Sequence, residues 1–194
     1  MKQILKALIL IIPFLSCEKE VIVGSGSIST EQRSVANFTK IEVQGRTAVT
    51  VQYGTNFKVE VKAYQNLLPV LETKLVGDAL QIGYKSNVSV TNDKSEVIVT
   101  MPFLTRFSTT GDSEIKILSG AANDFEAFIT GSSRLNAFGF TAKNVKINIE
   151  GNGFASISVV DRLKVNITGS GTVYYKGNPL VTSIITGTGR VEKR

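Results

Sequence analysis

Glycines recur at a nearly fixed interval through the second half of this 194-residue chain. They stand 20, 20, 18 and 18 residues apart, at Gly111, Gly131, Gly151, Gly169 and Gly187. The positions two residues before them form a mostly aliphatic column of Thr109, Ile129, Ile149, Ile167 and Ile185. The positions two residues after them hold only Ser or Gly. A repeat of this length indicates stacked copies of one unit, because each copy must bury its apolar face against the next.

From Val35 onward, single polar residues separate apolar and mostly β-branched ones. The clearest examples are Ile41 and Val43, Val49 and Val51, and Val59 and Val61. A period of two predicts strands with one buried face. One short segment, 64–68, which ends ahead of a proline, could be a helix or a loop. The pair Gly77-Asp78 predicts a turn, after which the alternation resumes.

Together these patterns predict an all-β fold, a single-stranded parallel β-helix that is most regular over residues 105–194. In that fold the isoleucines of successive turns lie on one another, about 4.8 Å apart, inside the winding sheet. The glycines turn the corners, because glycine tolerates a positive φ and a close approach of the backbone. The alternative is a β-sandwich built from evenly spaced hairpins, which explains the turns and leaves the matched columns unexplained.

The first 16 residues predict an export signal. Lys2 and Lys6 precede an almost wholly apolar run, 7–15, that is short for a membrane span. The only cysteine, Cys17, follows Ser16 in the manner of a lipoprotein cleavage site, so we expect Cys17 to carry a lipid anchor in the membrane. A stray thiol behind an ordinary signal peptide is the alternative. The expected organisation is a signal peptide at 1–16, a polar tether at 17–34 and a β domain at 35–194.

The order of several segments is distinctive. Phe38-Thr-Lys-Ile41-Glu-Val43-Gln-Gly45 is followed by the apolar alternations at 49–51, 59–68, 80–82 and 97–104, and then by repeated Gly-x-Gly blocks. This order resembles the family described as putative auto-transporter adhesin, head GIN domain (DUF2807), over about residues 35–190. The resemblance implies a right-handed parallel β-helix and a Bacteroidetes-type lipoprotein of the outer membrane, on its periplasmic or cell-surface side. It supplies no catalytic residues.

Composition excludes several catalytic chemistries. The chain has no histidine, so it can form no Ser-His-Asp triad, no Cys-His pair and no histidine-ligated metal site. The acid pair Asp112 and Glu114 is replaced by Ser132 and Arg134 one repeat later, so no acidic column builds up for Ca²⁺. We therefore expect no enzymatic activity, no cofactor and no metal site. The alternative is a polysaccharide-cleaving enzyme whose loops bring distant acids together.

The net charge and the outward-facing residues indicate which classes of partner the chain could bind. Without residues 1–16 the chain keeps 20 basic and 16 acidic side chains, a balance of 20 − 16 = +4 with no basic run, so we expect no nucleic-acid partner. In the predicted register Phe128 and Ile184 face outward and could mark an interface, and the outward Tyr174 could stack on a sugar ring. The favoured function is a non-enzymatic envelope lipoprotein that presents a binding or adhesion surface to a glycan or protein. An oligomeric structural scaffold is a further alternative.

Overall fold

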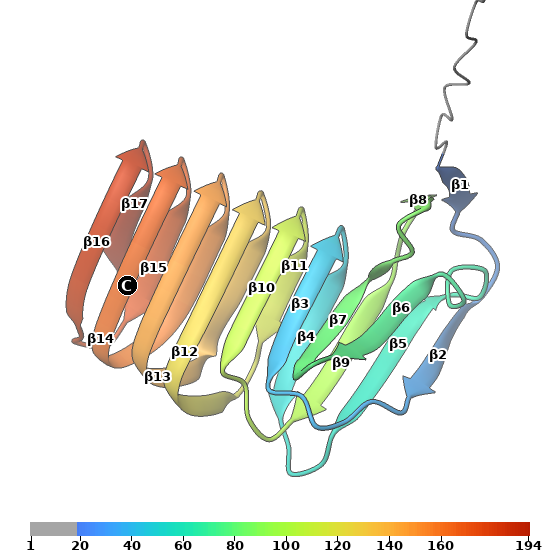
Figure 1. Ribbon diagram of the computed structural model, residues 1–194, viewed down its shortest axis with the longest axis horizontal. Coiled ribbons are helices and arrows are strands. Elements are labelled where there is room, and N and C mark those ends of the chain that lie inside the picture. The colour runs from blue at the N-terminus through green and yellow to red at the C-terminus, as the bar shows by residue number, and fades with distance from the viewer. Residues whose placement is uncertain (1–18) are drawn as a thin grey trace, which may run out of the picture.

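The computed structural model describes residues 19–194, so the signal segment and Cys17 lie outside the described residues (Figure 1). This range contains strands, turns and bends, and none of it forms a helix with the length and apolarity needed to cross a bilayer. The strands are β1 (Glu20–Val23), β2 (Ile28–Arg33), β3 (Lys40–Gly45), β4 (Ala48–Tyr53), β5 (Lys58–Tyr64), β6 (Leu71–Val76), β7 (Ala79–Tyr84), β8 (Val88–Thr91), β9 (Glu96–Met101), β10 (Arg106–Gly111), β11 (Glu114–Ile117), β12 (Gly120–Gly131), β13 (Arg134–Gly151), β14 (Phe154–Gly169), β15 (Thr172–Lys176), β16 (Leu180–Gly187) and β17 (Arg190–Lys193).

The matched isoleucine column is confirmed. Ile129 of β12 pairs in register with Ile149 of β13, which pairs with Ile167 of β14, which pairs with Ile185 of β16, and all three pairings are parallel. The first three of these side chains are about 1% exposed, because strands of a second layer cover them from the inside. That layer contains β4, β11, the first part of β13, the first part of β14, β15 and β17.

The corner glycines have the conformation that the sequence predicts. Gly151 has a φ of +111°, and a Cβ atom built on it would lie 2.7 Å from the carbonyl oxygen of Gly131 in the neighbouring strand. A side chain would therefore meet both a strained backbone and a steric clash. At each corner the chain turns sharply and passes from a strand of one layer into a strand of the other layer.

The first repeat fits the aliphatic column least well, and a buried hydrogen bond explains why it is tolerated. Thr109 occupies the isoleucine position and is buried, with its Oγ1 3.0 Å from the Oγ of Ser133. Ser133 is fully buried, and its Oγ also accepts a hydrogen bond from the backbone N–H of Ser113. Each of the two buried hydroxyls therefore has a hydrogen-bond partner, which offsets the free-energy cost of burying a polar group.

The predicted architecture is wrong, although the all-β class is confirmed. The main sheet of 15 strands is mixed and is no parallel β-helix, because β5 runs antiparallel to β2 and β9, and β6 runs antiparallel to β7. Its hydrogen-bonded path β2-β5-β9-β4-β11-β13-β12-β10-β3-β7-β6 folds back through the long β13, so the sheet is nearly closed around the core. The hairpin-built sandwich is not formed either, since β12, β13 and β14 pair in parallel.

The error has a local cause. Alternation of apolar and polar residues determines which face of a strand is buried and leaves the direction of the strand open. Gly77 and Asp78 form a two-residue turn with a φ of +60° at Gly77, and this turn joins β6 to β7 as a hairpin. The predicted turn is therefore present and reverses the chain. Segment 64–68 belongs to the end of β5 and the turn that follows it.

Strands also form within residues 19–34. β1 pairs with β8 in a separate two-stranded sheet, and β2 joins the main sheet beside β5. Figure 1 shows β1 at one end of the long axis of the molecule and β16 with β17 at the other.

Candidate binding surface

A groove of about 740 Å³ is lined by residues around the corner at Gly111, among them Asp112 and Glu114. Asp112 forms an ion pair with Arg46 at 2.8 Å, and Glu114 forms one with Lys116 at 3.2 Å. Among residues 19–194, no three His, Cys, Asp or Glu side chains gather closely enough to hold a metal ion. Asp112 and Glu114 are therefore each paired with a cation of the same chain.

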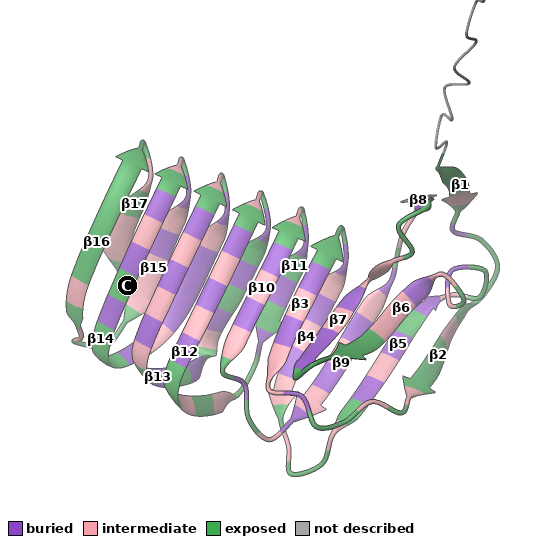
Figure 2. Cartoon of the chain, viewed as in Figure 1, coloured by how far each residue is buried: buried purple, intermediate pink, exposed green. Residues whose placement is uncertain are grey.

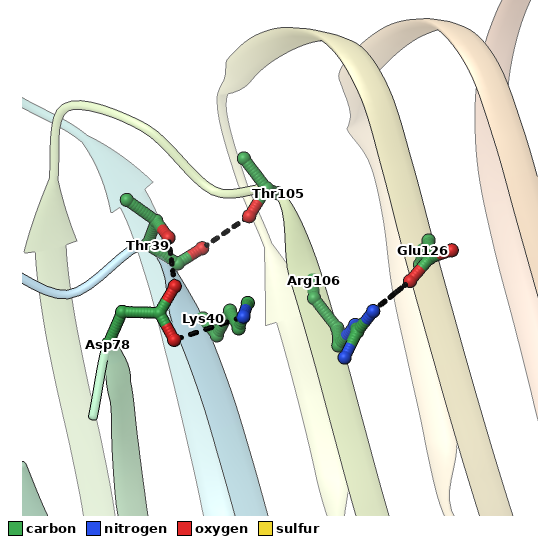
Figure 3. Close-up of polar contacts among 6 residues, drawn as sticks. All are labelled: Thr39, Lys40, Asp78, Thr105, Arg106 and Glu126. Atoms are coloured by element: carbon green, nitrogen blue, oxygen red, sulfur yellow. Dashed lines mark hydrogen bonds and ion pairs between the residues drawn. The ribbon is translucent and has the colours of Figure 1, made fainter. Parts of the chain in front are cut away.

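A second groove, of about 640 Å³, lies beside the start of β3 and β10, and Figure 3 shows its charged rim. Lys40 forms an ion pair with Asp78 at 3.0 Å, and the Oγ1 of Thr39 donates to the same carboxylate at 3.3 Å. The hydrogen bond from Lys40 lowers the pKa of Asp78 below its ordinary value. The Nε of Arg106 donates to Glu126 at 2.9 Å. Both cations of this rim are thus occupied by neighbouring acids.

The predicted contact residues Phe128 and Ile184 lie on one row of the sheet and do not meet. Phe128 is half-buried in β12, with the guanidinium carbon of Arg106 5.4 Å from its ring centroid. Ile184 in β16 is 62% exposed. Asn148 and Asn166 stand between them in the same register, and the Nδ2 of Asn166 donates to the Oδ1 of Asn148 at 2.9 Å. The two asparagine side chains are therefore linked by a hydrogen bond across adjacent strands.

The predicted contact residue Tyr174 belongs to the other layer, where aromatic rings and cations gather. Its ring packs edge-on against Phe154 of the adjacent strand, with centroids 5.5 Å apart and an interplanar angle of 66°. The guanidinium carbon of Arg194 lies 3.9 Å from the Tyr174 centroid, and that of Arg134 lies 4.6 Å from the Phe154 centroid. We call these four residues the aromatic–arginine patch. Beside it, the Nζ of Lys176 lies 4.5 Å from the Phe138 ring.

The cations of the patch and Lys176 are less tightly paired than Arg46 and Lys116 of the first groove, although Arg134 also lines that groove. Arg134 and Lys176 form no ion pair within residues 19–194, and both are exposed. Arg194 reaches Glu192 only at 3.9 Å, and Arg190 reaches the same carboxylate at 3.6 Å. Aromatic rings bind apolar faces of ligands, and guanidinium groups bind carboxylate, sulfate or phosphate through two parallel hydrogen bonds. The surface can therefore offer both kinds of contact to one anionic ligand.

The sequence patterns pointed to Tyr174 as a possible contact residue and did not indicate Phe154, Arg134 or Arg194 beside it. The signal was available in the column three residues after each corner glycine, which reads Glu114, Arg134, Phe154, Thr172 and Arg190. That column becomes a row of cross-strand neighbours only when the strands pair in the observed register. Arg194 lies outside the repeat, so only the fold places its guanidinium over Tyr174.

The described residues define an all-β domain with aromatic and cationic side chains gathered on one layer of the sheet. The family model for putative auto-transporter adhesin, head GIN domain, matches residues 37–117 and 106–179, which together span most of the chain. The chain belongs to this family. No match was found among the curated proteins.

Solved structures share the fold. A putative lipid binding protein from Parabacteroides distasonis is 19% identical, with a TM-score of 0.53 over 90% of this chain and 100% of that one. A putative adhesin from Parabacteroides merdae is 20% identical, with a TM-score of 0.50 over 90% and 99% of the two chains. A putative adhesin from Bacteroides fragilis is 15% identical, with a TM-score of 0.60 over 89% and 100%.

Proposed function

We propose that this chain is a non-enzymatic, lipid-anchored envelope protein that binds acidic polysaccharides through the aromatic–arginine patch. The anchor is Cys17, which attaches the domain to the outer membrane. The family description as an adhesin supports a binding role in the cell envelope. The observation that carries the choice of ligand is the pair of adjacent rings, Phe154 and Tyr174, each with a guanidinium group against it.

The chemistry of the patch favours sugars that carry negative charge. A sugar ring has an apolar C–H face that stacks on an aromatic side chain, while its carboxylate or sulfate accepts hydrogen bonds from arginine. Arg134 has no acid paired with it within residues 19–194, so its donors are available to a ligand. The sheet repeats every 18–20 residues along one axis, which suits a polymer better than a small molecule.

Binding can be measured with polygalacturonate as the acidic polymer and dextran as the neutral one. We expect polygalacturonate alone to bind, with an affinity that falls as salt is added. Tyr174→Ala should weaken binding at least tenfold, and Arg134→Gln should weaken it and flatten its salt dependence. Tyr53→Ala is the matched control, because Tyr53 is an exposed tyrosine of β4 with no cation over its ring in the described chain. Equal loss in the Tyr174 and Tyr53 variants would rule out the patch.

Two further measurements address the other parts of the proposal. Metabolic labelling with a fatty acid should mark the chain and leave the Cys17→Ser variant unlabelled; a labelled variant would contradict the anchor. Incubation with polygalacturonate should release no shorter chains or new reducing ends. Release of such products would instead favour the polysaccharide-cleaving enzyme.

A further inference from the structure

The C-terminal end of the main sheet has unpaired strand edges. β16 pairs only with β14, and β17 pairs only with β15. The eight residues of β16 therefore have a neighbour on one side alone, and about half of their backbone N–H and C=O groups point towards the free side. Figure 1 shows both strands at the end of the molecule farthest from β1.

The same end exposes apolar side chains that continue the core. Ile185 is 38% exposed, whereas Ile129, Ile149 and Ile167 in the same column are about 1% exposed. The outward Ile184 is 62% exposed as well. Figure 2 shows the contrast, because buried positions alternate along β14 and are missing from β16. Within residues 19–194, nothing packs on this end of the core.

The other two ends of the strand path are protected by charge. β2 has the ion pair Arg33–Glu31 at 3.0 Å, and β6 has Lys74–Glu72 at 2.7 Å. Natural edge strands usually carry such charges, or Pro or a bulge, which discourage pairing with another chain. β16 reads Leu-Val-Thr-Ser-Ile-Ile-Thr-Gly, with no charge and no Pro. It is the one long edge of the described sheet that is left fit for pairing.

We propose that this end docks onto the same end of a second copy of the chain, with the two β16 strands antiparallel around Ser183. Antiparallel neighbours share a face of the sheet, so Val181 lies opposite Ile185 of the second copy, and both face the joined core. Thr182 lies opposite Ile184 of the second copy on the outer face. The two-fold axis brings no like charges together along β16, and it uses the same surface on both copies, as closed dimers do.

The size of the contact indicates a weak dimer. Eight residues at about 3.3 Å each give an edge of roughly 26 Å, and two layers about 10 Å apart with their outer side chains give a width of roughly 20 Å. Each copy would bury about 500 Å², so the total of about 1,000 Å² lies at the lower limit for a specific interface. We therefore expect dissociation constants in the micromolar range rather than a permanent dimer.

The geometry has a consequence for adhesion that rests on the proposed function. The N-terminal strand β1 lies at the opposite end of the long axis from β16. In an end-to-end dimer the two N-termini point away from each other, so two lipid-anchored copies would connect two separate membranes. The partner of one copy would then be a copy on a neighbouring cell.

The test uses the chain from residue 17 with Cys17→Ser, which has no other cysteine. Sedimentation should show a shift from monomer towards dimer between about 1 and 100 μM, as the interface size suggests. Ser183→Lys places two cations face to face on the axis and should weaken association at least tenfold. Thr130→Lys, on an exposed position of β12, is the matched control and should leave association unchanged. A wild-type chain that stays monomeric at 100 μM overturns the proposal, as does equal behaviour of the two lysine variants.

Cross-linking tests the register separately. Residues that face each other across an antiparallel pair have Cα atoms about 4.5–5.5 Å apart, which a disulfide can bridge. Ser183→Cys should therefore form a covalent dimer on mild oxidation, and Thr130→Cys should not; cross-linking of both to the same extent contradicts the docking. A chain that dimerises and binds no acidic polymer would sink the proposed function and leave this interface intact, and the reverse result would do the opposite.

Discussion

Two positions of the isoleucine column allow the core to be tested with one substitution. Ile149 and Ile185 occupy equivalent positions of the repeat and pair through Ile167, yet one is 1% exposed and the other 38%. Replacing each by Ala removes the same atoms from different environments. The difference in unfolding free energy between the two variants therefore measures what stacking within the closed part of the sheet contributes.

The magnitudes follow from the exposed fractions. Ile→Ala removes three carbon atoms, worth about 2.4 kcal/mol at about 0.8 kcal/mol for each buried methylene. At Ile149 the strands on either side prevent collapse, so a cavity term adds to this value and brings the loss to about 3–4 kcal/mol. At Ile185 only about 60% of the residue is buried and water can enter, so we expect a loss of about 1–1.5 kcal/mol.

Urea denaturation followed by circular dichroism measures both values, with the linear extrapolation to water. The measurements belong at low protein concentration, where association through β16 contributes nothing. Equal losses at the two positions would refute the reasoning, because the column would then not be more tightly packed in its middle than at its end. Ile149→Asp provides a stronger form of the test: an unpaired buried carboxylate should prevent folding.

Three further substitutions test the corners and the half-buried Tyr84. Gly151→Ala should lower the free energy of unfolding, measured by thermal denaturation, by about 2 kcal/mol or more, because it adds a steric clash to the strain of a positive φ. Gly45 has a φ of +84° and open space around it, so Gly45→Ala should cost only about 1–2 kcal/mol of backbone strain. Equal losses in the two variants would exclude the clash. Burial raises the pKa of the Tyr84 phenol above its ordinary value of 10.0, so the phenol ionises in the unfolded chain before it ionises in the folded one. The stabilisation is therefore fully present below pH 10.0 and is lost as the pH rises above that value. Tyr84→Phe should remove this alkaline loss at the cost of about 1 kcal/mol for the hydrogen bond to Ser95 at 2.8 Å, and an unchanged pH profile would assign the alkaline loss to other groups.

Much of the candidate surface lay beyond sequence reasoning. The period of the glycines placed Tyr174 on an outward position, and column alignment could have added Arg134 and Phe154. The contact between Arg194 and Tyr174 depends on where β17 ends beside β15, which no repeat encodes. Phe128 and Ile184 share a row, but three strand spacings separate them, so they cannot act on one small ligand.

Alternation and glycine spacing are local properties of the chain, and they sufficed to predict strands from residue 35 onward, their buried faces and the in-register stacking of Ile129, Ile149, Ile167 and Ile185. They did not predict β1 and β2, which form where a tether was expected. The directions of β5 and β6, the mixed and nearly closed sheet, and the unpaired end at β16 became visible in the folded structure alone. Strand direction depends on which distant edge is free to pair when the chain turns back. That choice is made by hydrogen bonds between segments far apart in sequence, which a period of two does not record.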